Sequence, residues 1–391
     1  MDRVPSAQTR TFRNVLFWIH LTAGTVAGLV ILVMALTGAL IAFEPQIVDF
    51  AERAVRNVTP PGPDVRRLSM KTIIAKAREA VPEIAPSGVT LRSEPTSSAA
   101  VAFGRGETVF VDPYTGDVLG KGSKTHKFLN EIEDWHRWLG SREIGRPITG
   151  VCNAAFLVLV VTGIYLWRPR RWNATTLKSM TLLKTGLRGK ARDWNRHTVI
   201  GLWCAPILLL ITLTGLIMSY QWANDLLYTL TGNTPSPAQQ AASPTRPPEP
   251  PLEKLDALWT RAEQQSPGWV AIILRFPLQP GRPVNVSIQE QSTWHPSPRS
   301  QLTLNPATAE MVKWEPFSEF NLGRKLRSWV RPIHTGAAGG ILSQIIAGSS
   351  AVGGVMLVWT GLAMARRRIF RRKSKPVAAP TVPTTESKSP L

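Results

Sequence analysis

Four of the six histidines in this 391-residue chain occur at repeated spacings, which makes them the residues best placed to do chemistry. His20 and His197 are each followed by glycine four residues later and by a Thr-Gly dipeptide beginning 17 residues later. The dipeptides are Thr37-Gly38 and Thr214-Gly215. This shared pattern indicates that His20 and His197 occupy equivalent positions in two related helices.

His136 and His334 follow a second pattern. Each is followed by glycine 14 residues later and by a Thr-Gly dipeptide beginning 26 residues later, Thr162-Gly163 and Thr360-Gly361. The two patterns alternate along the chain, which predicts a duplicated helix–insert–helix unit. Two crossings in each half keep both halves in the same orientation, so equivalent histidines are expected at the same side of a membrane.

Two neutral imidazoles at the same depth on facing helices are suitable axial ligands for low-spin haem iron. We therefore predict that His20 pairs with His197 and His136 with His334, each pair binding the iron of one haem b. A non-haem metal site and purely structural histidines remain alternatives. Zinc and iron transport sites usually add carboxylates or thiolates, and these helices carry none near their histidines at membrane depth. His126 and His295 lack repeat partners and are expected to be solvated or locally hydrogen-bonded.

The elements that would position these histidines are four stretches almost free of charge, at residues 15–43, 148–167, 199–222 and 341–365. About 20 residues of helix cross a hydrocarbon core of ~30 Å. The expected fold is an α-helical integral membrane protein with transmembrane helices at 14–43, 136–167, 197–222 and 334–365. The second and fourth segments each begin with a short outer haem segment. A break is predicted at Gly140, Gly145 and Pro147, and a similar bend at Gly336, Gly339 and Gly340.

Two polar inserts, residues 44–135 and 223–333, are expected to be α+β. The first is predicted to have a helix at 70–80 and strands at 89–92, 99–103 and 108–111. The second is predicted to have a helix at 252–264 and strands at 271–276, 284–289 and 301–305. Residues 234–251 contain seven prolines and read as a linker, and residues 374–391 lack apolar content and read as disordered. Cys152 and Cys204 both fall in apolar stretches, so neither can form a disulfide bond within an insert.

The formal net charge of +20 is concentrated in three segments, residues 1–17, 168–196 and 366–391, which together hold +17. Lys and Arg clustered at alternate helix ends predict cytoplasmic termini (1–13 and 366–391), a cytoplasmic loop (168–196) and inserts on the opposite side of the membrane. The same distribution favours contact with lipid headgroups over binding of nucleic acid.

Basic residues near the outer helix ends are candidates for attracting an anionic chelate, with headgroup contact as the alternative. They are Arg142, Arg146, Arg324, Lys325, Arg327 and Arg331. Four arginines are candidates to pair with haem propionates: Arg13, Arg137, Arg196 and Arg331. No nucleotide-binding or flavin-type motif is present, so electrons would have to come from a membrane quinol or a soluble cytoplasmic reductase.

Several motifs resemble those of the PepSY-associated transmembrane proteins, a family of bacterial inner-membrane proteins that includes FoxB-type siderophore reductases. The resemblance spans residues 10–372. It rests on Trp18-Ile19-His20, on residues 110–119 (FVDPYTGDVL), on Trp135-His136-Arg137, on residues 162–167 (TGIYLW) and on Ile333-His334-Thr335-Gly336. The second insert departs from the family pattern, with Asn305 and Ala309 where the first has Asp112 and Gly116.

The resemblance implies four transmembrane helices, periplasmic PepSY inserts and two b-type haems held by His20, His136, His197 and His334. It also implies transfer of electrons outward to a periplasmic acceptor, which in FoxB-type members is iron(III) held by a siderophore. The leading hypothesis is therefore a ferric or ferric-siderophore reductase of the inner membrane. The alternatives are a non-catalytic regulator or sensor and an uptake permease for iron or its chelates.

Overall fold

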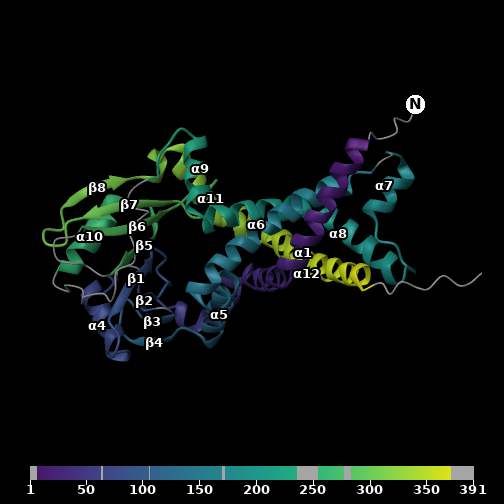
Figure 1. The fold of residues 1–391 in the computed structure, drawn as a ribbon. Coiled ribbons are helices and arrows are strands. Elements are labelled where there is room, and N and C mark those ends of the chain that lie inside the picture. Colours follow the sequence, from purple (N-terminus) through teal and green to yellow (C-terminus); the bar gives the residue numbers. More distant parts are fainter. Residues whose placement is uncertain are drawn as a thin grey trace, which may run out of the picture.

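The computed structural model describes residues 7–62, 65–104, 106–169, 172–235, 254–276 and 283–370. Most of the predicted linker, the whole of the predicted disordered tail and part of the basic run 168–171 lie outside these residues. The molecule is elongated, with a bundle of long helices at one end and a sheet-containing lobe at the other (Figure 1). We call these the bundle and the lobe.

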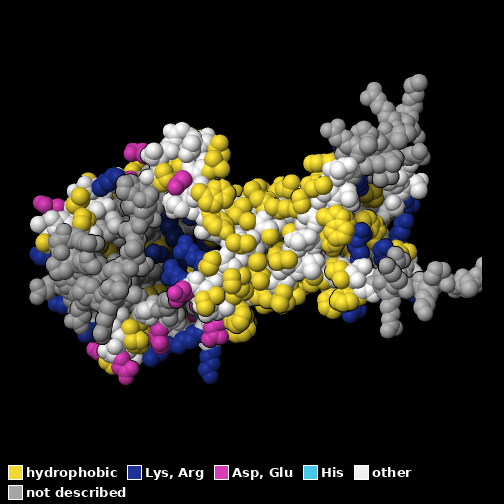
Figure 2. Space-filling view, viewed as in Figure 1, with side chains coloured by type: hydrophobic (Ala, Val, Ile, Leu, Met, Phe, Trp, Pro, Cys, Tyr) yellow, Lys and Arg dark blue, Asp and Glu magenta, His cyan; other side chains and the backbone are white. Residues whose placement is uncertain are grey.

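Four helices in the described part of the chain are long and apolar enough to cross a membrane. They are α1 (Ala7–Ile41), α6 (Arg142–Trp167), α8 (Gly189–Ser219) and α12 (Gly340–Ile369). Both α1 and α8 pack against α6 and α12, so α1 and α8 occupy one diagonal of the bundle. Large apolar side chains cover its outer surface, and Val26, Trp203 and Trp359 are each at least two-thirds exposed (Figure 2). A bundle that is apolar on the outside is suited to lipid, so the chain is a multi-pass membrane protein.

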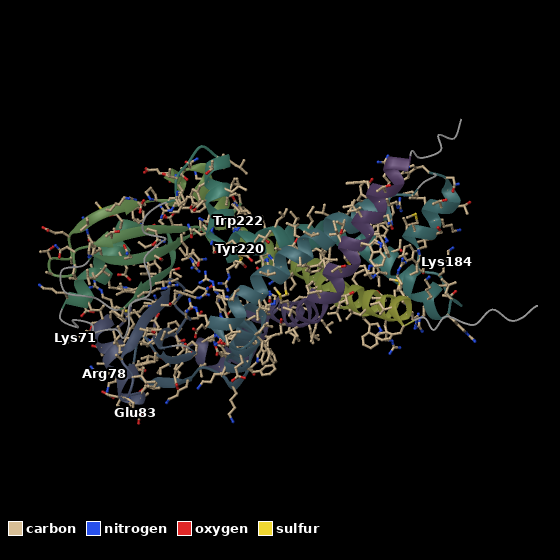
Figure 3. All side chains as sticks on the ribbon, viewed as in Figure 1. Lys71, Arg78, Glu83, Lys184, Tyr220 and Trp222 are labelled. Carbon is tan, nitrogen blue, oxygen red and sulfur yellow. The ribbon has the colours of Figure 1, made fainter. Side chains whose placement is uncertain are left out.

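Shorter helices connect the bundle to its surroundings. At the lobe end lie α2 (Glu44–Ala51), α3 (Arg53–Arg56), α5 (Lys124–Trp138), α9 (Gln221–Leu230), α11 (Leu322–Thr335), η3 (Phe317–Glu319) and η4 (Ala337–Gly339). At the opposite end, α7 (Ala174–Thr181) packs on α8. Figure 3 marks the two ends by Lys71 in the lobe and Lys184 beside α7, with Tyr220 at the junction of lobe and bundle.

Breaks ahead of the second and fourth long helices are present at Gly140 and Gly336, but the expectation for Gly145 and Pro147 was wrong, because both lie inside α6. The α5 helix ends at Trp138 and is followed by Leu139 and Gly140, which both have positive φ, and α6 begins two residues after Gly140. The α11 helix ends at Thr335 and is followed by Gly336, with φ of +79°, and α12 begins at Gly340, with φ of +68°. Glycine adopts these left-handed conformations without steric cost, so these breaks could be read from the sequence. As a result, His136 and His334 lie on short helices at the lobe end.

The two inserts form one continuous sheet of eight strands in the order β4-β3-β2-β1-β5-β6-β7-β8. The first insert supplies β1 (Pro86–Arg92), β2 (Ala99–Phe103), β3 (Glu107–Val111) and β4 (Val118–Lys121). The second supplies β5 (Trp269–Arg275), β6 (Val284–Glu290), β7 (Arg299–Leu304) and β8 (Met311–Glu315). The halves join where β1 pairs antiparallel with β5, with Thr90 opposite Ile273. The sequence patterns predicted two separate inserts, and the joint sheet was not expected from them.

One face of the sheet is covered by α4 (Met70–Ala80) and α10 (Leu255–Gln265), whose positions agree with the predicted helices. Val89 and Leu91 of β1 alternate inward with Ile272 and Leu274 of β5 to form a single apolar core with these helices. The core therefore crosses the joint between the inserts. The other face of the sheet carries the intervening, more polar side chains and is turned toward the bundle (Figure 1).

Candidate functional site

The four repeated histidines form two pairs in space. His20 of α1 and His197 of α8 face each other across the diagonal of the bundle, with ring centroids 6.3 Å apart. At the lobe end, His136 of α5 and His334 of α11 have ring centroids that are also 6.3 Å apart. We call these the inner pair and the outer pair. Each pair takes one histidine from each half of the chain.

Both rings of the inner pair are held at Nδ1 by threonine. His20 Nδ1 lies 2.9 Å from the Oγ1 of Thr162, and His197 Nδ1 lies 2.9 Å from the Oγ1 of Thr360. Each threonine donates its own hydroxyl proton to a carbonyl four residues earlier in its helix. The hydroxyl oxygen is therefore left to accept a hydrogen bond from Nδ1–H of the histidine.

The outer pair is held in the corresponding way. His136 Nδ1 lies 3.1 Å from the Oγ1 of Thr37 and 2.9 Å from the carbonyl oxygen of Met34. His334 Nδ1 lies 3.1 Å from the Oγ1 of Thr214 and 3.0 Å from the carbonyl oxygen of Ile211. A carbonyl oxygen only accepts, so each Nδ1 must carry the proton. This tautomer leaves the lone pair on Nε2, the nitrogen then free to bind a metal.

In three of the four Thr-Gly dipeptides, the glycine lies beside one of the paired histidines. A methyl group at Gly38 would come within 3.1 Å of His136 Cε1, and one at Gly163 or Gly361 would come within 3.4 Å of the Cε1 of His20 or His197. The fourth glycine, Gly215, instead lies against Asn153. Glycine thus gives three of the four imidazoles room beside the threonine that holds them.

The pairs fit a metal group that needs only two ligands from the protein. Two imidazoles bound to one metal ion through Nε2, with bonds of about 2 Å, have ring centroids about 6 Å apart, close to the observed 6.3 Å. Within the described residues, no cluster of three or more His, Cys, Asp or Glu side chains is placed to hold a metal ion. A bare zinc or iron ion takes more protein ligands than these pairs offer, whereas haem brings four ring nitrogens and requires two axial ligands.

The protonation state of the outer pair also suits ligation. Burial, followed by the charge of His334, lowers the pKa of His136 to about 4. Burial also lowers the pKa of His334. Both imidazoles are therefore neutral near pH 7, as a metal ligand must be.

The remaining two histidines have local partners. His126 Nδ1 lies 3.2 Å from the buried carboxylate of Glu52, and His295 Nε2 lies 3.0 Å from the hydroxyl of Ser328. Neither belongs to a pair. The free thiols of Cys152 and Cys204 lie in the bundle, as expected from the sequence.

Most of the arginines and lysines singled out from the sequence have structural partners. Arg324 forms an ion pair with Glu315, and Arg327 donates to the side chain of Asn224. Lys325 donates to the carbonyl oxygen of Ser318. Arg331 forms a long ion pair with Glu133, at 4.0 Å, and is exposed at the edge of a cavity.

Of the candidate propionate partners, Arg13 donates to the carbonyl oxygens of Leu166 and Arg168, at the end of α6. Arg137 pairs with Glu133 and lies over the ring of Trp138. Arg196 is exposed.

The threonines that orient the imidazoles were not assigned a role from the sequence. The Thr-Gly dipeptides were visible as markers of the repeat, but which helix each threonine faces is settled only by packing. Two buried indole N–H groups, of Trp138 and Trp167, have no hydrogen-bond partner within the described residues. Trp138 lies two residues after His136, and Trp167 lies five residues after Thr162. A polar group of a bound ligand near each pair could satisfy them.

Comparison with known protein families matches residues 17–368 to the family model described as the PepSY-associated TM region. The match includes all four histidines, all four Thr-Gly dipeptides and every strand of the sheet. No curated protein matches the chain.

Proposed function

The chain belongs to the family of the PepSY-associated TM region, as its motifs suggested, and we propose that it is a di-haem b protein that carries electrons across a membrane. The observation that carries this proposal is the presence of two histidine pairs at different depths of one bundle. On α1, His20 of the inner pair lies 17 residues before Thr37, which holds the outer pair. At ~1.5 Å per residue this separation is about 25 Å, most of the thickness of a bilayer core.

In this proposal, His20 and His197 bind the iron of one haem b, and His136 and His334 bind the iron of the other. Bound haem iron supplies reversible one-electron redox chemistry. The protein fixes the proton of each imidazole on Nδ1 through a threonine hydroxyl, joined at the outer pair by a carbonyl oxygen, and surrounds the inner pair with apolar helices. It also keeps the outer imidazoles neutral. The buried indole N–H groups of Trp138 and Trp167 are suitable donors to carboxylates of the bound groups.

The proposed direction of transfer runs toward the lobe. The bundle end opposite the lobe carries the basic segments, which favours a cytoplasmic position for that end and a periplasmic position for the inserts in a bacterial inner membrane. A quinol or a soluble cytoplasmic reductase would supply the electrons. The acceptor we favour is iron(III) held in a siderophore, each iron taking one electron to become iron(II), which siderophores hold less tightly. A quinol that gives up two electrons and two protons would reduce two such irons.

The test is spectroscopic. Purified full-length protein is expected to show a Soret band that shifts on reduction with dithionite and a b-type pyridine haemochrome close to two haems per chain. His20→Ala is expected to remove the inner haem and leave the outer one, and His136→Ala is expected to do the reverse. The substitution His126→Ala, at a histidine outside both pairs, is the matched control and keeps both haems.

Anaerobic reoxidation of the reduced protein by ferric siderophores, ferric citrate and sulfite then identifies the acceptor. Colourless protein from haem-replete cells would rule out the electron-transfer proposal and favour a regulator or a permease. Protein that is red but is reoxidised only by sulfite would retain the haem assignment and exclude iron as the substrate.

A further inference from the structure

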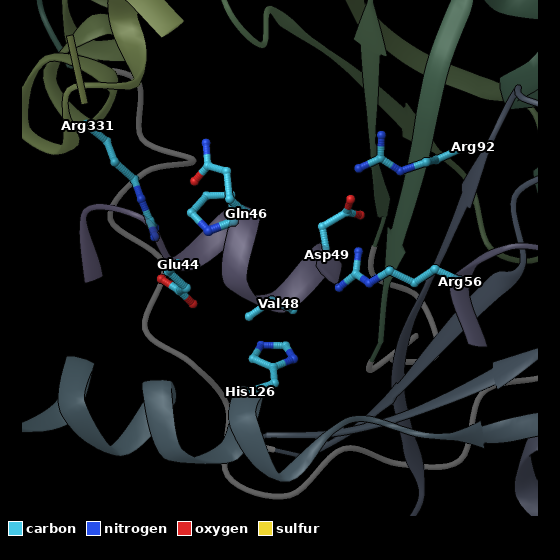
Figure 4. A pocket seen from close by; sticks show the side chains of 9 residues that line it. Glu44, Gln46, Val48, Asp49, Arg56, Arg92, His126 and Arg331 are labelled. Carbon is cyan, nitrogen blue, oxygen red and sulfur yellow. The ribbon is translucent and has the colours of Figure 1, made fainter. Parts of the chain in front are cut away.

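A cavity of about 520 Å³ lies between the lobe and the bundle, near the outer histidine pair (Figure 4). Its lining comes from α2, the end of α3, the end of β1, the start of α5 and α11. Arg331 in this lining lies one helical turn before His334 of the outer pair. Glu133, which contacts Arg331 at 4.0 Å, lies three residues before His136. The Arg331 edge of the cavity therefore lies about one turn from His334 and, through the contact with Glu133, close to the turn of α5 that precedes His136.

Lys and Arg side chains gather in the hollow between the lobe and the bundle (Figure 2). Three arginines lie on the polar face of the sheet, which is turned toward that hollow: Arg92 at the end of β1, Arg275 at the end of β5 and Arg299 at the start of β7. Their neighbours Leu91 and Leu274 are buried on the opposite face against α4 and α10. Because side chains alternate along a strand, the three arginines project from the face that is turned toward the bundle.

These three guanidinium groups have no acidic partner. Within the described residues, the guanidinium groups of Arg92, Arg275 and Arg299 take part in no ion pair and donate no hydrogen bond; Arg67 donates only to the backbone carbonyl oxygen of Arg92. They also influence one another, since burial and then the charges of Arg275 and Arg331 lower the pKa of Arg299. Cationic groups held together without counter-ions repel one another, and a bound anion relieves that repulsion.

Acidic residues near the cavity offset only part of this charge. Arg56 in the lining is already paired with Glu52 at 2.6 Å. Glu44 and Asp49 also line the cavity, and burial together with the charge of Glu133 raises the pKa of Glu44. Arg92 and Arg331 point into the same space from opposite sides (Figure 4). The space thus has both acidic and basic side chains on its bundle side and arginine side chains on its sheet side.

We propose that the hollow between the sheet and the outer histidine pair binds an anionic, carboxylate-bearing metal chelate through Arg92, Arg275, Arg299 and Arg331. The inference deepens the proposed function, on which it rests, by naming the substrate class of the acceptor site. Guanidinium groups bind carboxylates through paired, charge-assisted hydrogen bonds. The positive charge of these arginines also disfavours binding of chelates that carry a net positive charge. The bound chelate lies beside the histidine pair from which it would receive an electron.

The experiment measures binding without redox chemistry. Gallium(III) citrate, which cannot accept an electron here, is titrated into full-length protein in detergent and followed by calorimetry. The triple variant Arg92→Gln/Arg275→Gln/Arg299→Gln is expected to bind it roughly 10- to 100-fold more weakly, since each lost contact is a hydrogen bond between charged groups. The control variant Lys71→Gln/Lys184→Gln/Lys190→Gln removes the same net charge at exposed positions away from the hollow and is expected to change affinity less than about twofold.

A gallium chelate of net positive charge is the second probe, and it is expected to bind the wild-type protein more weakly than the citrate complex. Equal losses in the two triple variants would overturn the proposal, as would tighter binding of the cationic chelate. If the arginines are needed for binding of anionic lipid and not for binding of gallium citrate, they bind a lipid headgroup and the proposal is overturned. The single variants Arg92→Gln and Arg299→Gln repeat the test if the triple variant does not fold. Because gallium is not reduced, this binding test does not depend on haem. Colourless protein that binds gallium citrate through the arginines would retain this site and reject the proposed function. Red protein that does not bind gallium citrate would retain the proposed function and reject this site.

Discussion

Replacing Thr37 by valine tests whether the threonines orient the imidazoles. Valine has nearly the shape of threonine, so the change removes one hydroxyl with little effect on packing. The Thr37 hydroxyl donates to the carbonyl oxygen of Val33 at 2.6 Å and is left to accept from His136 Nδ1 at 3.1 Å. In the variant, His136 keeps its other acceptor, the Met34 carbonyl oxygen at 2.9 Å. One of two acceptors is therefore lost, and the proton stays on Nδ1.

The expected magnitude follows from that partial loss. A single neutral hydrogen bond contributes about 0.5–1.5 kcal/mol net, which corresponds to roughly a 2- to 12-fold weaker affinity at the outer haem site. This lies at or below the lower end of the 10- to 100-fold loss typical when a ligand's outer partner is removed altogether. The inner pair is expected to be unchanged, because its threonines are Thr162 and Thr360.

The assay combines haem content by pyridine haemochrome with a spectroelectrochemical titration that resolves the two haems. Thr25→Val is the matched control. Thr25 lies on the same helix and its hydroxyl makes the same bond to a carbonyl four residues earlier, at 2.7 Å, but it contacts no histidine. Indistinguishable behaviour of the two variants would refute the orienting role of Thr37. A change confined to the inner haem would refute the assignment of Thr37 to the outer pair.

Two further predictions concern steric room and acid stability. Gly38→Ala places a methyl group within 3.1 Å of His136 Cε1 and is expected to lower haem content at the outer site, whereas Gly28→Ala, which meets only the flexible side chain of Leu362, is not; equal haem content in both would contradict this. Burial raises the pKa of Glu52, but hydrogen bonds from Ser123 and Arg56 outweigh it and leave that pKa lowered. The carboxylate therefore contributes stability above its unfolded pKa of about 4.3, and that contribution is lost as pH falls through the lower folded value. Thermal unfolding between pH 3 and 7 should depend less on pH in Glu52→Gln than in the wild type, where Glu315, whose pKa is also lowered, keeps its own contribution in both proteins. The same slope in both would disprove the role of Glu52.

The long helices and the breaks between helices could be predicted because their signals are local. A charge-free run of about 20 residues is visible in any window, and the glycines at 140 and 336 mark the breaks directly. The grouping of the histidines was also accessible, because equal spacing to a Thr-Gly dipeptide identifies equivalent positions. The ligand role of those histidines stays a prediction until haem is measured.

The joint sheet was not predictable from local patterns. Residues 88–92 of β1 pair with residues 271–275 of β5, about 180 positions later, and nothing in either segment marks the other as its partner. The edge strands β4 and β8 were also missed. Val118–Lys121 has only four residues and none is buried, so it lacks the apolar alternation that identifies a strand.

The arginines of the proposed chelate site could not be selected from the sequence for a related reason. Basic residues near the helix ends stand out in the sequence, and several of these, such as Arg324 and Arg327, bind neighbouring side chains. Arg92, Arg275 and Arg299 lie on strands, where their alternation with apolar neighbours predicts only that they face away from the core. Whether this outer face of the sheet contacts water or the bundle depends on how the whole lobe lies on the bundle. The sequence of a single strand does not determine that arrangement.

The order of strands connects the hollow to the outer histidine pair through the chain itself. The sheet begins at β4 and ends at β8, and these edge strands lead into α5 with His136 and, through η3, into α11 with His334. The two edge strands therefore lead to the two helices that carry the outer pair, and the β1–β5 ladder lies in the middle of the sheet between them. Any change in the register of that ladder must move α5 and α11 relative to each other. A substitution that disrupts β1–β5 pairing, far from every ligand, should consequently alter the spectrum of the outer haem and leave the inner haem unchanged.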